Sequence, residues 1–280
     1  MFKQIYLQKN IFEVYLYARR GEMSCKFGMP TLIEKNNILD NVLLCKELGL
    51  DFVELNLNLP YCMDIPAQEM LKLKEIYDIG FTIHFHEDVD FGYFYEEIRQ
   101  ANINLFRNIA IWASKFEVEK INIHLNPGVY FTLPEEKIFV YEKYKEIFME
   151  KFIDSMDRII DIANPLGIKV CVENMKVYEF MKETFIKLIG IDNLYFTWDV
   201  GHDAMSNYIM EKIYLENPHK VNHMHMHDYN GISDHQIISE GIIPIKERIN
   251  FAKENNISVV IETKTEEALR QSVKKLKLLR

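Results

Sequence analysis

The feature that most constrains the fold of this chain is a regular alternation of two kinds of segment. Eight short segments have the apolar, aromatic and β-branched composition of buried strands. Each is followed by a longer segment whose apolar residues recur at helical spacing. The predicted strands are residues 26–30, 52–57, 81–86, 120–125, 169–173, 194–199, 221–227 and 258–262. The predicted helices are residues 38–48, 68–77, 93–115, 135–163 (one long or two shorter helices), 178–189, 208–215, 245–255 and 266–279.

This alternation predicts a parallel sheet, because each parallel pair of consecutive strands needs a crossover connection. Eight such units over residues 25–280, without a Pro- or Gly-rich linker, are typical of a single-domain (β/α)8 TIM barrel, an α/β fold. The alternative is an open doubly wound sheet. That fold requires a Gly-rich turn after the first strand, where this chain has Met29-Pro30-Thr31. Residues 1–24 fit no unit and are expected to form an N-terminal extension.

Composition narrows the possible functions. The net charge of −9 disfavours nucleic acid as a partner, because phosphate contacts need clustered Lys and Arg. The four cysteines have irregular spacings, which predicts reduced thiols in a cytoplasmic protein rather than a disulfide framework. No apolar run approaches the ~20 residues of a membrane helix, and the N-terminal segment lacks the apolar core of a signal peptide. We therefore expect no membrane partner.

Polar side chains gather where the predicted strands end. In a (β/α)8 barrel the C-terminal ends of all strands meet at one mouth, which carries the active site. Of the nine histidines, only His219 lies outside this set. One core or capping histidine would need no function, but the joint placement predicts a site. The candidates are His84, His86, His124, Glu173, Asp199, His202, His223, His225, His227, Asp228, Asp234, His235 and Glu262.

The segment 194–203 shows the expected chemistry most clearly. A strand-like run ends in Asp199, and His202 follows three residues later. A buried charge there costs several kcal/mol unless something neutralises it. A divalent metal would do so, because Asp oxygen and His nitrogen are both good Zn or Mn ligands. The alternative interpretation is an Asp that caps the following helix and a surface His.

Strand periodicity predicts which of these side chains share a face. Residues two apart in a strand point the same way, so His223, His225 and His227 form one row, and His84 and His86 form another. If these rows line the barrel, the residues nearest the mouth reach a metal. The deeper ones would orient metal ligands through hydrogen bonds.

The strand ends resemble, in order, the signatures of the xylose isomerase-like barrel superfamily. This superfamily contains sugar isomerases, sugar epimerases and the endonuclease IV group. The resemblance covers roughly residue 25 onward and depends on the ordered series, since each motif alone is weak. The motifs are Thr82-Ile83-His84, His124 with Pro127-Gly128, Val172-Glu173-Asn174, Asp199-Val200-Gly201-His202, His225-Met226-His227-Asp228, His235 with Glu240-Gly241, and Ile261-Glu262.

The resemblance implies a metal-dependent sugar or sugar-phosphate isomerase or epimerase. Its substrate would be a small-molecule sugar or sugar phosphate, and related barrels often pair, so a homodimer stays open. Proton transfer would pass through a metal-stabilised enediolate. The implied ligands of a Mn, Zn or Mg ion are Glu173, Asp199, His225 and Glu262.

The resemblance also assigns roles around that metal. Glu173 and Glu262 would act as the acid/base pair, and His202 would contact substrate oxygens. His84 and His124 are expected to bind either substrate or a second metal. The full set of expected substrate-binding residues is His84, His86, His124, His227 and His235.

Two alternatives remain at this point. The endonuclease-like relatives hold three zinc ions, and their extra ligands match His84, His124, His202 and His235. Their last Asp ligand falls on Ser233, and Asp234 is one residue late. This group implies a multi-zinc phosphodiesterase or abasic-site endonuclease. The other alternative is a barrel that binds sugar or metal without catalysis, and the intact four-ligand set argues against it.

Overall fold

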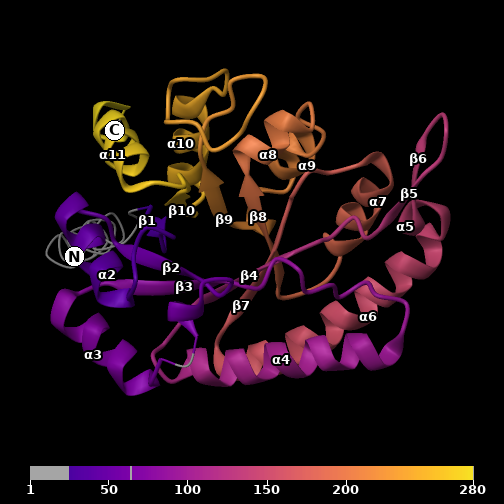
Figure 1. Ribbon diagram of the computed structural model, residues 1–280, viewed down its shortest axis with the longest axis horizontal. Helices are drawn as coiled ribbons and strands as arrows, with labels where there is room; N and C mark the ends of the chain where they lie inside the picture. The colour runs from indigo at the N-terminus through magenta and orange to yellow at the C-terminus, as the bar shows by residue number, and fades with distance from the viewer. Residues whose placement is uncertain (1–24, 64, 280) are drawn as a thin grey trace, which may run out of the picture.

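Eight parallel strands close into a barrel, which confirms the predicted (β/α)8 fold (Figure 1). The computed structural model describes residues 25–63 and 65–279, so the extension predicted for residues 1–24 lies outside the described residues. Around the barrel the strand order is β1-β10-β9-β8-β7-β4-β3-β2, and β1 pairs with β2. The strands are β1 Phe27–Pro30, β2 Phe52–Asn56, β3 Gly80–His84, β4 Lys120–His124, β7 Lys169–Glu173, β8 Leu194–Asp199, β9 Val221–Met226 and β10 Ser258–Ile261.

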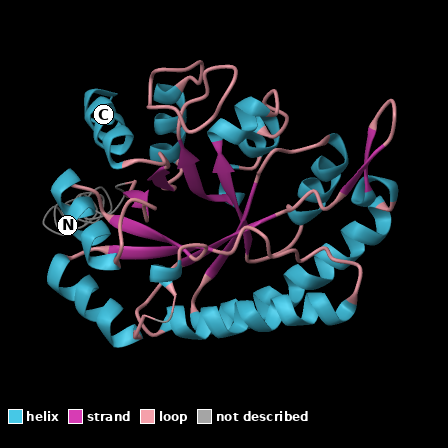
Figure 2. Ribbon diagram, viewed as in Figure 1, coloured by secondary structure: helices cyan, strands magenta, loops and turns pink. Residues whose placement is uncertain are grey.

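Helices surround the strands (Figure 2). The α-helices are α2 Ile38–Leu48, α3 Ala67–Tyr77, α4 Glu96–Ser114, α5 Val140–Lys143, α6 Lys145–Ala163, α7 Glu179–Leu188, α8 Val200–Met205, α9 Glu211–Glu216, α10 Ile245–Glu254 and α11 Glu266–Leu279. Short 3-10 turns are η1 Pro60–Cys62, η2 Asn164–Leu166 and η3 Pro218–Lys220. Among the described residues, none of the helices is both long and apolar enough to cross a membrane.

The structure corrects the predicted helix over residues 135–163. A hairpin of β5 (Tyr130–Thr132) and β6 (Lys137–Phe139) leads into α5, and only α6 is a long helix. Figure 1 shows this hairpin standing away from the barrel. The prediction is therefore wrong only over residues 135–139, which form the turn of the hairpin and β6, whereas residues 140–163 contain two helices as the second option expected. The structure also adds α8, which directly follows β8 where only a loop was expected.

The core forms between the outer face of the strands and the apolar stripe of each helix. In α2 the buried stripe includes Val42, Cys45 and Leu48. Leu39 and Leu43 lie outside that stripe and are 39% and 45% exposed. Within the described part of the chain, no disulfide joins the four cysteines.

The parallel register brings the expected site residues to one level of the barrel. Asp199 on β8 pairs with His225 on β9, and Glu173 on β7 pairs with His124 on β4. His84 is the last residue of β3. Since these positions end their strands, their side chains meet at the C-terminal mouth.

Candidate metal centre

Four buried ligand-type side chains converge at the mouth from successive strands β7, β8, β9 and β10. Ligand atoms of Glu173, Asp199, His225 and Glu262 all lie within 4.8 Å of one another. His225 Nδ1 is 3.1 Å from Glu262 Oε2 and 3.3 Å from Glu173 Oε2. It lies 3.9 Å from Asp199 Oδ2. We call this set the four-ligand group.

The four-ligand group fits a divalent cation. Among the described residues, neither His225 Nδ1 nor Glu262 Oε2 has an aligned hydrogen-bond partner, although both are buried. Burial opposes a charge on the His225 ring, but the carboxylates of Glu173 and Glu54 outweigh it and raise the pKa of this imidazole well above its usual range. A proton therefore balances carboxylate charge here. A divalent ion would displace that proton and compensate the charge more fully.

Asp199 also caps the helix that follows it, as the alternative interpretation of the sequence predicted. Its Oδ1 accepts a hydrogen bond of 2.7 Å from the backbone N–H of His202 and so caps α8. Its backbone is held by the side chain of Asn174, which accepts from Asp199 N–H at 2.9 Å and donates to Asp199 O at 2.8 Å. The cap uses Oδ1, while Oδ2 lies 3.2 Å from His227 Nε2, 3.3 Å from His202 Nδ1 and 3.9 Å from His225 Nδ1. The capping interpretation is therefore confirmed, but the surface histidine that accompanied it is wrong, because His202 is buried. The role of Asp199 as a metal ligand stays a prediction.

A second group adjoins the first through a shared carboxylate. His84, His124 and Glu173 also offer ligand atoms within 4.8 Å. The two imidazoles face each other with Nε2 atoms 3.1 Å apart, and Glu173 Oε2 lies 3.4 Å from His124 Nε2. The amide of Asn122 donates a hydrogen bond to Glu173. This geometry suits either one proton shared between two nitrogens or a second metal ion, which His84, His124 and Glu173 would hold.

A third group adjoins the four-ligand group at Asp199. It consists of His202, His227 and His235, whose ligand atoms again lie within 4.8 Å. His227 Nε2 is 3.1 Å from Asp199 Oδ1, and the rings of His227 and His235 stack with centroids 4.1 Å apart. Asp234 Oδ2 lies 3.4 Å from His202 Nε2. The one-residue offset of Asp234 seen in the sequence therefore does not keep its carboxylate from the group.

The electrostatics of His202 differ from those of a free imidazole. Burial opposes its charge, but the carboxylates of Asp199 and Asp234 outweigh this effect and raise the pKa of His202 to about 11. His202 also lies near the four-ligand group, with Nδ1 3.6 Å from Glu173 Oε1. Without a metal, this imidazole is a cation and a hydrogen-bond donor at neutral pH.

The structure does not bring His86 to these groups. Its half-buried ring packs edge-on against Phe85, with centroids 5.4 Å apart. Within residues 25–63 and 65–279, no hydrogen bond or ion pair joins the His86 side chain to the site. His86 lies beyond the end of β3, so strand alternation no longer determines its direction.

Sequence reasoning missed Glu54 and Lys264, which contact the four-ligand group, as well as Asn122. Glu54 on β2 is 1% exposed, and its Oε1 lies 2.8 Å from His225 Nε2. Lys264 follows β10 and places Nζ 2.9 Å from Glu262 Oε1. The available signal for Glu54 was a lone carboxylate inside the apolar run of residues 52–57.

Gly201 is required by the close approach of α8 to His227. A Cβ atom at this position would lie 1.9 Å from His227 Cε1. We expect Gly201→Ala to push α8 or the His227 ring aside and to lower the free energy of unfolding by about 1–3 kcal/mol. Gly190→Ala is the matched control, because its Cβ would meet only Lys187 O at 3.6 Å. Equal unfolding free energies of the two variants in urea would contradict the packing shown here.

Comparisons with known proteins agree with this fold. The chain is 26% identical over 240 residues to an uncharacterized protein of Methanocaldococcus jannaschii, covering 82% of this chain and 87% of that protein. A D-tagatose 3-epimerase-like protein superposes with a TM-score of 0.75 at 22% identity, covering 91% of this chain and 96% of that one. The IolI protein with a bound zinc atom superposes with a TM-score of 0.72 at 18% identity, covering 91% and 97%.

These structural likenesses are too distant in sequence to show more than a common fold. The family assignment comes instead from a family model that matches residues 42–279, which is most of the chain. The ordered strand-end motifs lie within or beside that range. The chain therefore belongs to the xylose isomerase-like TIM barrel family.

Proposed function

We propose that this protein is a metal-dependent sugar or sugar-phosphate isomerase or epimerase. The observation that carries the proposal is the convergence of three buried carboxylates on one nitrogen of His225 at the barrel mouth. Three carboxylates and one imidazole suit Mn, Zn or Mg. Superposition on a D-tagatose 3-epimerase-like protein and on a zinc-containing barrel supports this proposal.

The proposed chemistry assigns proton transfer to Glu173 and Glu262. They come from β7 and from the end of β10, and both lie beside His225 Nδ1 at 3.3 and 3.1 Å. Two carboxylates that approach a substrate from different strands can act on opposite faces of a planar enediolate, as epimerisation requires. A bound divalent cation would polarise the substrate carbonyl and stabilise the negative charge that develops.

The histidines around this pair would bind and orient the substrate. His202 donates hydrogen bonds to substrate oxygens, and the rings of His227 and His235, which pack against His202, line the same side of the substrate site. His84 and His124 contact substrate oxygens on the Glu173 side or hold a second metal ion. His86 is the weakest member of the proposed set, because its ring lies apart from the others. A homodimer stays a prediction.

One observation favours a second candidate function. Among the described residues, four groups could hold a metal: the four-ligand group shares Glu173 with the His84 and His124 group, and it shares His225 with a group that contains Glu54 and His223. Such an arrangement is also suited to a multi-metal phosphodiesterase, in which adjacent ions stabilise the attacking and leaving oxygens. The net charge of −9 argues against a DNA substrate for it.

Metal stoichiometry combined with a substrate screen separates the two functions. The purified protein is stripped with chelator, reloaded with Mn, Zn or Mg, and analysed for metal content per chain. Metal-dependent interconversion of ketoses or ketose phosphates at one ion per chain is the expected result. Two or three tightly bound ions, with cleavage of abasic DNA or another phosphodiester and no ketose turnover, would favour the second candidate.

A further inference from the structure

The barrel interior beneath the metal centre contains buried polar residues that the proposed chemistry does not use. Glu54, His223, Ser258 and Lys120 come from β2, β9, β10 and β4, and their exposed fractions are 1%, 0%, 8% and 7%. We call these four residues the lumen network. They occupy the interior of a barrel that usually holds branched apolar side chains, so their presence needs a reason.

The upper end of the lumen network is Glu54, which contacts two histidines with its two oxygens. Oε1 lies 2.8 Å from His225 Nε2, and Oε2 lies 2.8 Å from His223 Nε2. Thr82 Oγ1 donates a third contact to Glu54 Oε2 at 3.1 Å. One carboxylate therefore joins a residue of the four-ligand group to the deeper histidine of the same strand.

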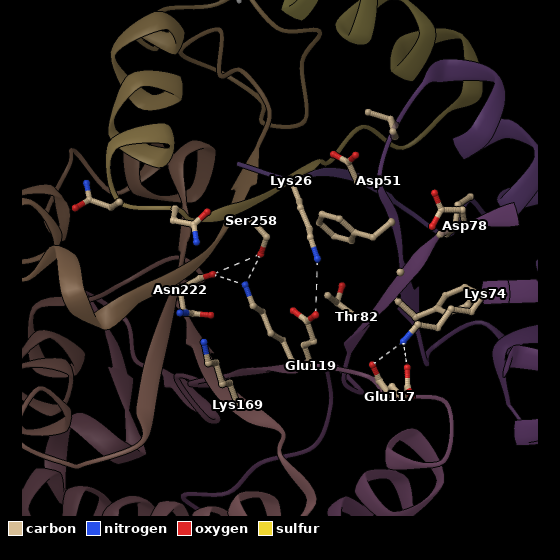
Figure 3. A pocket seen from close by; sticks show the side chains of 18 residues that line it. Lys26, Asp51, Lys74, Asp78, Thr82, Glu117, Glu119, Lys169, Asn222 and Ser258 are labelled. Carbon is tan, nitrogen blue, oxygen red and sulfur yellow. Dashed lines mark hydrogen bonds and ion pairs between the residues drawn. The ribbon is translucent and has the colours of Figure 1, made fainter. Parts of the chain in front are cut away.

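The lower end reaches the opposite face of the barrel. His223 Nδ1 lies 2.6 Å from Ser258 Oγ, and Lys120 Nζ donates to Ser258 Oγ at 2.6 Å and to Asn222 O at 2.7 Å. Ser258 and Asn222 line a pocket of about 690 Å³ at the N-terminal ends of the strands (Figure 3). The network thus spans the barrel from the metal centre to the N-terminal face.

The two ring nitrogens of His225 face different groups. Nδ1 faces the carboxylates of the four-ligand group, whereas Nε2 faces the carboxylate of Glu54 on the opposite side of the ring. A carboxylate behind a metal-binding imidazole keeps the proton on the rear nitrogen and makes the front nitrogen a better ligand. The Glu54 contact is an ion pair rather than a well-aligned hydrogen bond, so its effect is chiefly electrostatic.

We propose that Glu54 is a positioning residue that fixes His225 for metal binding through Nδ1, and that His223, Ser258 and Lys120 hold Glu54 in place. This inference rests on the proposed metal centre. A purely structural role is the competing explanation. The structural explanation is weaker, because buried ion pairs stabilise a fold poorly compared with apolar side chains of similar size. Apolar side chains alone would fill the barrel interior at least as well.

Metal titration of Glu54→Gln tests the proposal without any enzymatic assay. The substitution preserves size and removes the charge behind His225. We expect the dissociation constant for Zn²⁺, measured by calorimetry on chelator-stripped protein, to rise about 10–100-fold. With Co²⁺ as a probe, the visible absorption band of the bound ion should shift, because the imidazole ligand has changed. A purely structural role would move neither property.

Two further variants make the result interpretable. Asp90→Asn removes another carboxylate with hydrogen bonds, to Tyr141 Oη and Gly92 N, outside the metal centre. It should leave the Zn²⁺ affinity unchanged. His223→Gln removes the imidazole that contacts Glu54 Oε2, so it should also raise the dissociation constant for Zn²⁺. This variant tests the proposal if Glu54→Gln does not fold.

The outcomes separate this inference from the proposed function. Failure of the unsubstituted protein to bind Zn²⁺, Mn²⁺ or Co²⁺ would overturn the metal centre and, with it, the role of Glu54. Normal binding by the unsubstituted protein, with Glu54→Gln and His223→Gln within about twofold of it and the Co²⁺ spectrum unchanged, would overturn the role of Glu54 alone.

Discussion

Asp199→Asn is expected to abolish tight binding of a divalent cation while leaving the barrel folded. Asp199 Oδ2 faces His225 Nδ1, and Oδ1 caps α8 through the backbone N–H of His202. An Asn side chain retains an oxygen that can accept the capping hydrogen bond, but it lacks the negative charge that attracts the cation. Because a ligand is lost, the metal affinity should fall more than the ~10–100-fold typical of residues behind the ligands.

Comparison with Asp199→Ala separates the two roles of this residue. The Ala variant should lose metal binding to the same extent and also lose the cap. The free energy of unfolding of its metal-free form should therefore be about 0.5–2 kcal/mol lower than that of metal-free Asp199→Asn. Metal content after dialysis and urea unfolding measure the two effects. Full metal occupancy in either variant would show that Asp199 is not a ligand.

Glu173→Gln is expected to reduce turnover of a ketose substrate by about 10²–10⁴-fold, the usual contribution of a general acid or base. Glu173 is 1% exposed and lies between the four-ligand group and the His84 and His124 pair. The amide keeps the size of the side chain but accepts no proton at neutral pH. Since Glu173 is also a proposed ligand, turnover is measured at saturating metal, with the metal content determined in parallel.

Glu240→Gln is the control for this experiment. Glu240 lies in the loop after β9 and pairs with Lys275 on α11 at 2.6 Å, and it belongs to none of the groups that could hold a metal. It should retain full turnover. Activity of metal-loaded Glu173→Gln within about tenfold of the unsubstituted protein would exclude Glu173 as the proton-transfer residue.

Much of the barrel could be predicted because its signals are local. The predicted bounds of α2, β7, β8 and α11 match the structure. In each, the apolar period and the flanking polar residues lie within one short stretch of sequence. The β5–β6 hairpin escaped prediction because its strands have only three residues each, too few to show the alternation of a strand, and β6 directly precedes the helical residues of α5.

Site residues could be predicted where they lie at strand ends, but not where tertiary contacts alone bring them to the site. Asp199 ends β8 and His225 is the second-last residue of the neighbouring β9, so the barrel alone places them together. Glu54 is 169 residues from His223, and only the closed barrel brings β2 across from β9. Lys264 lies beyond the end of β10, where strand alternation no longer indicates that its Nζ approaches Glu262 Oε1 at 2.9 Å.

Solvent-deuterium incorporation tests the central claim most directly. The metal-loaded protein is incubated in deuterated water with a panel of ketoses and their phosphates, and each sugar is examined by NMR for deuterium at the carbon α to the carbonyl. Metal-dependent exchange that disappears with chelator and in Glu173→Gln is the predicted result, because Glu173 and Glu262 would move that proton. No exchange with any of these sugars, together with metal-dependent cleavage of abasic DNA or another phosphodiester, would contradict the account.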